Sequence, residues 1–80
     1  KGRKLKSLAE SKVESYLKYP LTASFGSVSI YQAGNTYTVS GTVTAENGFG
    51  VPSTMNYKLY YTNNNGSYEF DFGEIDGKLI

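Results

Sequence analysis

The chain has 80 residues, the length of one small domain, with eight basic and seven acidic side chains and no Cys or His. This near-neutral charge indicates no particular partner, and the missing residues exclude disulfides, thiolate zinc sites and histidine-based catalysis within the chain. Its apolar runs are far shorter than the roughly 20 residues that cross a bilayer. The sequence opens without Met, so we expect a fragment, a processed product or a part expressed by itself, folded as a single domain over residues 1–80.

Polar and charged residues are unevenly used. Ser, Thr, Asn and Tyr supply 30 of the 80 residues, whereas only 15 are charged. A Cys-free surface of hydroxyls and amides is common in secreted proteins of Gram-positive bacteria and their phages, so we expect an extracytoplasmic location. Residues 1–18 hold six basic and two acidic side chains, a net charge of +4, and residues 19–80 carry −3. A solvated helix start accounts for this basic segment, and membrane proximity is the alternative interpretation.

The first predicted element is a helix over residues 4–18. Its apolar residues recur every three or four positions, as on one face of an amphipathic helix. They are Leu5, Leu8, Ala9, Val13, Tyr16 and Leu17. Pro20 disfavours helical geometry at the preceding residue, so the helix should end near residue 18. A helix this short is marginal alone and needs a surface to cover.

Four strands are predicted after the helix. Apolar and polar residues alternate in each, which is typical of an antiparallel sheet with one buried and one solvated face. The predicted strands cover residues 27–33, 36–45, 54–62 and 67–72. Residues 75–78 allow one more turn, after which residues 79–80 would begin a further strand.

The turns between these strands predict how they pair. A two-residue loop at 34–35 places Ile30 opposite Val39 and Tyr31 opposite Thr38. In this register the apolar residues of both strands share one face.

The second hairpin is predicted in the same way. A four-residue loop at 63–66 places Leu59 opposite Phe70 on the buried face and Lys58 opposite Asp71 on the wet face. A slip of one residue in either hairpin would break the agreement of the apolar faces.

One helix with an apolar stripe and one sheet with an apolar face predict a two-layer α+β domain of order αββββ. The N-terminal helix is expected to pack across a four-stranded antiparallel meander. The predicted core consists of Leu5, Leu8, Val13, Leu17, Phe25, Val28, Ile30, Val39, Val43, Met55, Tyr57, Leu59, Phe70 and Phe72.

Two segments resemble a family of small bacterial and phage domains. Residues 16–25 (YLKYPLTASF) are similar to the family's LKSPSTAKF segment, and residues 34–50 (GNTYTVSGTVTAENGFG) to its GNxYxVxGxVxAxNxFG segment. The resemblance covers residues 13–61 and implies a helix followed by a β-meander. Such domains often form the outer C-terminal module of lipoproteins or of membrane-anchored, zinc-ribbon-containing proteins. Members often carry a basic residue after the Phe-Gly pair, where this chain has Val51.

The end of the chain has a second, shorter resemblance. Residues 68–80 are similar to the last hairpin of PepSY domains, which are associated with peptidase control.

Carboxylates are the remaining candidates for chemistry. Glu69 and Asp71 share a face of one strand, as paired catalytic carboxylates would, but a flat sheet offers no desolvated pocket, and a solvated face explains them better. Residues 71–77 have an acidic spacing somewhat like a calcium loop, without the ligand pattern of an EF-hand, and a turn rich in Asp and Gly explains it equally well. We therefore expect no enzyme activity, no catalytic residues, no cofactor and no metal. We also expect no nucleic-acid partner, because the exposed Tyr31 and Tyr60 would share their face with Glu69 and Asp71 rather than with basic residues.

Four residues are predicted partner contacts. Phe49 and Val51 lie in the 46–53 loop, where Phe49 either contacts a partner or folds back to cap the core. Tyr31 and Tyr60 belong to the hydroxyl-rich outer face of the sheet. These residues favour a non-enzymatic accessory or binding module of a membrane- or wall-tethered bacterial or phage protein, with a protein or cell-envelope component as its partner. The alternatives are an inhibitor or immunity-type protein acting through its hairpin loops, and a structural spacer.

Overall fold

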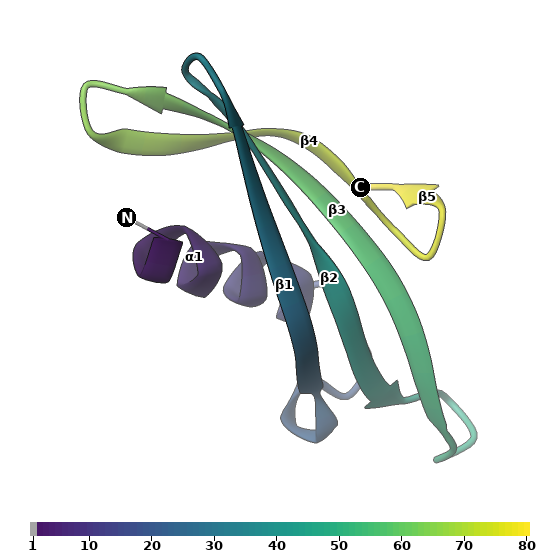
Figure 1. Cartoon of the computed structure of the whole chain (residues 1–80). Helices are drawn as coiled ribbons and strands as arrows, with labels where there is room; N and C mark the ends of the chain where they lie inside the picture. The colour runs from purple at the N-terminus through teal and green to yellow at the C-terminus, as the bar shows by residue number, and fades with distance from the viewer. Residues whose placement is uncertain (1) are drawn as a thin grey trace.

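The computed structural model describes residues 2–80 and contains one α-helix and one antiparallel sheet. The helix α1 covers Gly2–Glu14, and a 3-10 turn, η1, covers Pro20–Thr22. The strands are β1 (Ser24–Ala33), β2 (Thr36–Glu46), β3 (Pro52–Asn64), β4 (Ser67–Ile75) and β5 (Lys78–Leu79). They follow one another in the sheet as a meander, and α1 lies across one face (Figure 1). The α+β class is confirmed, with five strands rather than the predicted four.

The fifth strand exists because the chain turns tightly after β4. Asp76 and Gly77 both have positive φ angles, of 56° and 80°, as the two-residue type I′ hairpin requires. Ile75 then pairs with Lys78. The other strands extend up to three residues beyond their predicted ends.

The helix α1 ends at Glu14, four residues before its predicted end. Beyond it, the Tyr16 amide donates to the Val13 carbonyl at 3.0 Å, a bond that spans three residues rather than four. The Ser15 hydroxyl also donates to the Lys12 carbonyl at 2.6 Å. The chain therefore tightens into a 3-10 turn well before Pro20, as helix ends commonly do.

The core lies between α1 and the inner face of the sheet. Its buried members are Leu5, Ala9, Val13, Tyr37, Val39, Val43, Tyr57, Leu59, Tyr61 and Ile75. The three helix residues are four positions apart, so they face the sheet together. Leu8 lies beside this stripe and is 37% exposed, so its assignment to the core is wrong.

The predicted register of the first hairpin is confirmed. Ile30 lies opposite Val39, and Tyr31 lies opposite Thr38. Gly34 has a φ of 63°, the geometry that a type II′ turn needs at its first central position. The turn and the apolar alternation thus specify the same pairing.

The predicted register of the second hairpin is wrong. Its loop has two residues, Asn65-Gly66, with φ angles of 55° and 89°. Two successive positive φ angles make a type I′ turn, for which Asn-Gly is the preferred sequence. Phe70 consequently lies opposite Tyr61 and not Leu59.

A β-bulge then changes the alternation of β4. Tyr61 pairs with Phe70 and Tyr60 pairs with Phe72, so Asp71 is the extra residue between two consecutive pairs. One inserted residue exchanges the two faces for the rest of the strand. Phe72 is therefore on the outer face and 52% exposed, and its predicted place in the core is wrong.

Gly73 and Ile75 take the inner positions after the bulge. A Cβ at Gly73 would lie 2.6 Å from Leu59 Cδ2, so glycine is what lets β4 pack closely here. On the outer face, Lys58 lies opposite Glu74, which corrects its predicted pairing with Asp71.

The hydroxyl of Tyr57 is the unusual feature of the core. It is buried, and among the described residues it has no hydrogen-bond partner. A Cβ at the opposite residue, Gly41, would lie 2.8 Å from Tyr57 Oη, so this glycine provides the space for the phenol. Burial, and secondarily the negative charge of Glu10, raise the pKa of Tyr57 above its ordinary value of 10.0.

Packing of α1 on the sheet predicts a contrast between two leucines of one helix. Leu5→Ala should cost about 2–5 kcal/mol of unfolding free energy because it leaves a cavity in the core. Leu8→Ala, the matched control, should cost about 1 kcal/mol or less because its side chain already meets water. Urea unfolding of both variants measures the difference, and equal costs would contradict this packing.

The unpaired Tyr57 hydroxyl predicts that Tyr57→Phe keeps or raises stability, by up to about 1 kcal/mol at pH 7, because an unsatisfied buried group is removed. The raised pKa adds a pH dependence. Because the folded protein favours the neutral phenol, this contribution to the free energy of unfolding is complete below the unfolded-state pKa near 10.0. It is lost as the pH rises through the higher pKa of the folded state. Wild type should therefore lose stability faster than Tyr57→Phe above pH 10 in denaturant titrations. A large loss in the variant at pH 7 would instead reveal a bound partner for the hydroxyl.

Two candidate contact surfaces

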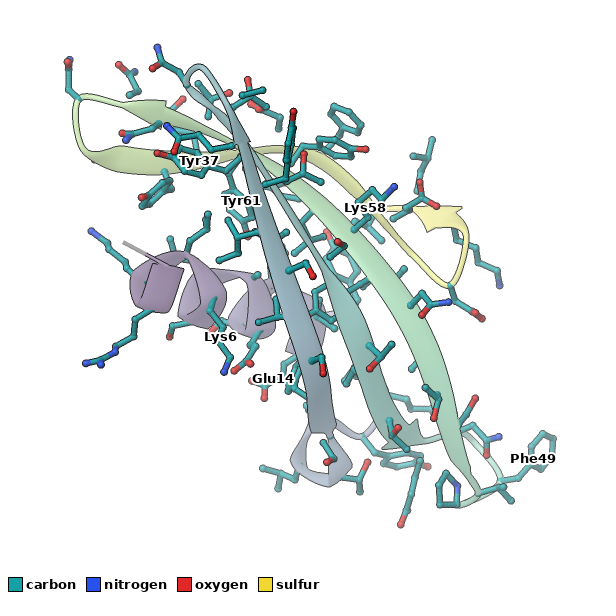
Figure 2. All side chains as sticks on the ribbon, viewed as in Figure 1. Lys6, Glu14, Tyr37, Phe49, Lys58 and Tyr61 are labelled. Carbon is teal, nitrogen blue, oxygen red and sulfur yellow. The ribbon has the colours of Figure 1, made fainter. Side chains whose placement is uncertain are left out.

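The four predicted contact residues fall on two separate surfaces. Tyr31 and Tyr60 are both register partners of Thr38, on the outer face of the sheet. Phe49 and Val51 lie in the loop after β2, and β2 continues for eight residues beyond Thr38, roughly 26 Å of extended chain. In Figure 2 the label of Phe49 stands at the opposite end of the sheet from that of Tyr61. The predicted residues therefore do not form one site.

Three aromatic side chains form a row across the outer face. Strand pairing aligns Tyr31 of β1, Thr38 of β2, Tyr60 of β3 and Phe72 of β4. The rings of Tyr60 and Phe72 stack with centroids 4.3 Å apart and planes inclined by 15°. Tyr31 is 69% exposed. We call Tyr31, Tyr60 and Phe72 the aromatic row.

A polar groove borders the aromatic row. The neighbouring line of paired outer positions consists of Ser29, Ser40, Lys58 and Glu74, one from each of the first four strands. These four residues line the groove together with hydroxyl and amide side chains farther along the strands, Thr42 among them. The groove is shallow and open, so it offers hydrogen-bond donors and acceptors without enclosing a ligand.

The loop after β2 holds its aromatic residue away from the sheet. The Asn47 side-chain oxygen accepts hydrogen bonds from the Phe49 amide at 2.8 Å and the Val51 amide at 3.2 Å. Gly50, with a φ of 75°, completes the turn by donating to the Asn47 carbonyl at 3.0 Å. Phe49 is 91% exposed and projects outward in Figure 2, so the interpretation of Phe49 as a core cap is wrong.

Other exposed apolar residues gather at the same end of the molecule. η1 is tied to the end of β2 by a hydrogen bond of 2.9 Å from the Glu46 amide to the Thr22 hydroxyl oxygen. Leu21 of η1 is fully exposed, and Tyr16 and Tyr19 are also exposed. Leu21 was not among the predicted contact residues, because it lies in the linker after the predicted helix, outside any periodic pattern. A large apolar residue in such a linker is the signal that indicates it.

The carboxylates considered for chemistry are exposed to solvent. Asp71 accepts a hydrogen bond from the Thr62 hydroxyl, and Glu69 lies opposite the same threonine. Within residues 2–80, no three Asp or Glu side chains converge as metal ligands. Over the same residues, no helix has the length and hydrophobicity needed to cross a bilayer.

Comparisons of the chain with family models, curated proteins and solved structures give no significant match. Its resemblance to the small bacterial and phage domains, and that of residues 68–80 to PepSY domains, therefore stay predictions.

The exposure of Phe49 predicts that Phe49→Ala lowers stability by less than about 1 kcal/mol, because the ring contributes little to the fold. Phe70→Ala is the matched control. Phe70 packs edge-to-face on Tyr61, with ring centroids 5.6 Å apart, and lies under Lys12 Nζ. Its truncation should cost about 2–4 kcal/mol. Thermal unfolding compares the two, and a loss at Phe49 as large as at Phe70 would refute the exposed loop.

Proposed function

We propose that this domain is a non-enzymatic binding module of a membrane- or wall-tethered extracytoplasmic protein from a bacterium or phage, and that its outer face is the binding surface. The aromatic row carries this proposal. Tyr31 and Phe72 keep large apolar surfaces in water on a face that no other element within residues 2–80 covers. Aromatic side chains flanked by polar groups are the usual anchors of binding sites.

Open geometry supports binding rather than catalysis. The polar groove is shallow, and the carboxylates of Glu69 and Asp71 lie exposed on the sheet face. A general acid or base usually depends on a desolvated pocket that tunes its pKa. A flat face with aromatic anchors suits the recognition of an extended partner.

The basic residues of α1 support an orientation of the domain near an anionic surface. Arg3, Lys4 and Lys6 are exposed in the first turns of the helix. Lys12, by contrast, lies 4.4 Å above the Phe70 ring and so has a role in the fold. We assign the membrane-proximal side of the domain to the exposed basic residues at the start of α1. The hydroxyl-rich, Cys-free composition supports the extracytoplasmic location.

The loop after β2 favours a second candidate function. A rigid turn that presents Phe49 and Val51 to solvent has the shape expected of an inhibitor or immunity-type protein that inserts a hairpin loop into a cleft. In this alternative the aromatic row is not needed for binding.

A purely structural role depends on the sheet edge. β1 is an edge strand of ten residues, long enough to pair with another chain. Gly26 and Ser27 together lie opposite Thr42 as a β-bulge, which interrupts the edge and opposes strand addition. This feature disfavours the spacer or self-assembling alternative.

Co-sedimentation of the purified domain with Gram-positive cell-envelope fragments tests the proposal. Tyr31→Ala should lower the bound fraction at least about fivefold because it removes an anchor of the row. Phe49→Ala is the matched control, since it removes an even more exposed ring from the other surface, and it should bind as wild type does. A loss with Phe49→Ala alone would support the inhibitor-type alternative. Absence of wild-type sedimentation would refute binding to the envelope.

A further inference from the structure

We propose that the outer face binds an uncharged glycan chain, whose sugar rings lie along the aromatic row and whose hydroxyls reach into the polar groove. This inference names the ligand of the surface in the proposed function and rests on it. Four features carry it: the spacing of the rings, their exposure, the polar residues beside them and the charge of the face.

The spacing of the aromatic residues matches a chain of sugars. Tyr31 and Tyr60 are two strands apart, and strands lie roughly 4.8 Å apart, so the two residues are separated by roughly 10 Å. Two linked hexose rings in an extended glycan span a similar length. Thr38 lies between the two tyrosines and is smaller than either, so a chain can pass over it from one ring to the next.

The rings offer the surface that sugars need. One face of a pyranose carries several C–H groups and packs on the electron-rich face of an aromatic ring. Tyr31 stands largely free in solvent, on the edge strand. Tyr60 and Phe72 stack with ring centroids 4.3 Å apart, which covers one face of each ring and fixes the remaining surface of the pair before any ligand arrives.

The polar groove supplies partners for the sugar hydroxyls. Its line nearest the aromatic row contains the hydroxyls of Ser29 and Ser40, the ammonium of Lys58 and the carboxylate of Glu74. A sugar hydroxyl both donates and accepts, so mixed partners of this kind suit it. The outer face therefore has an apolar line, the aromatic row, beside a polar line in the groove. A sugar chain has the same two kinds of surface, since its ring faces are apolar and its edges carry hydroxyls.

The charge of the outer face disfavours the other extended polymers. The charged residues of this part of the face are one lysine, Lys58, and three acids, Glu69, Asp71 and Glu74, so it has an excess of two negative charges. Nucleic acids and anionic wall polymers would be repelled, since their binding depends on cationic contacts. The groove is also more polar than the centre of a typical protein interface, which is depleted of charged residues. An uncharged glycan fits both the charge and the polarity of this face.

Titration of the isotope-labelled domain with four hexasaccharides tests the inference by NMR. The uncharged probes are cellohexaose, xylohexaose and chitohexaose, and hexagalacturonate is the anionic control. At least one uncharged probe should shift amide signals of Tyr31, Ser40, Lys58 and Tyr60, and hexagalacturonate should bind more weakly. No shift with any uncharged probe, or shifts centred on Phe49 or on α1, would overturn the inference, as would tighter binding of the anionic probe.

Two variants assign the binding to the aromatic row. Tyr31→Ala should raise the Kd for the uncharged probe at least about tenfold, whereas Tyr16→Ala, an exposed tyrosine outside the sheet, should leave it unchanged. Equal effects of the two variants would overturn the inference. If the glycans fail to bind but Tyr31→Ala still lowers sedimentation with envelope fragments, the proposed function holds and the glycan inference is overturned. If both assays fail, the outer face is not a binding surface.

Discussion

Asp71, the extra residue of β4, determines which aromatic side chains are buried and which meet water. Before it, Phe70 packs on the inner face, and after it, Phe72 stacks on Tyr60 on the outer face. The Thr62 hydroxyl donates to the Asp71 carboxylate, which gives the extra residue a polar partner on the solvent side. The bulge therefore completes the core and creates the aromatic row in a single step, because every later side chain of β4 changes its face.

One short helix covers only part of this sheet. α1 buries Leu5, Ala9 and Val13, whereas the sheet extends beyond the helix in Figure 1. Edge-to-face aromatic pairs continue the inner face there, with the rings of Tyr37 and Tyr68 5.3 Å apart, and Lys12 lies over the ring of a neighbouring phenylalanine. Large aromatic residues bury much area each, so they extend the core of a small domain without a second helix.

The sequence specified the first hairpin because two independent signals agreed, the Gly34-Asn35 turn and the alternation of both strands. Alternation alone does not specify the second, because the same alternation fits several loop lengths, and only the Asn65-Gly66 pair indicates the two-residue type I′ loop. Because of the bulge at Asp71, the alternation of β4 does not predict that Phe72 lies on the outer face. In the sequence, the bulge is visible only in the positions of the inner residues. Phe70, Gly73 and Ile75 all face inward, and they fit an alternating strand only if one residue between Phe70 and Gly73 is extra. The two tyrosines of the row were predictable because no bulge lies between them.

Stability explains some of the aromatic row and not the rest. The stack of Tyr60 on Phe72 is a cross-strand pair of the kind that contributes roughly 0.2–1 kcal/mol to a sheet, and it lies next to the bulge at Asp71, which interrupts the ladder. Tyr31 has no such reason to be aromatic, because its partner across the strand is Thr38 and most of its surface meets water. A serine or threonine there would serve the fold as well. Tyr31 is therefore the residue at which a structural and a binding explanation of the outer face diverge most.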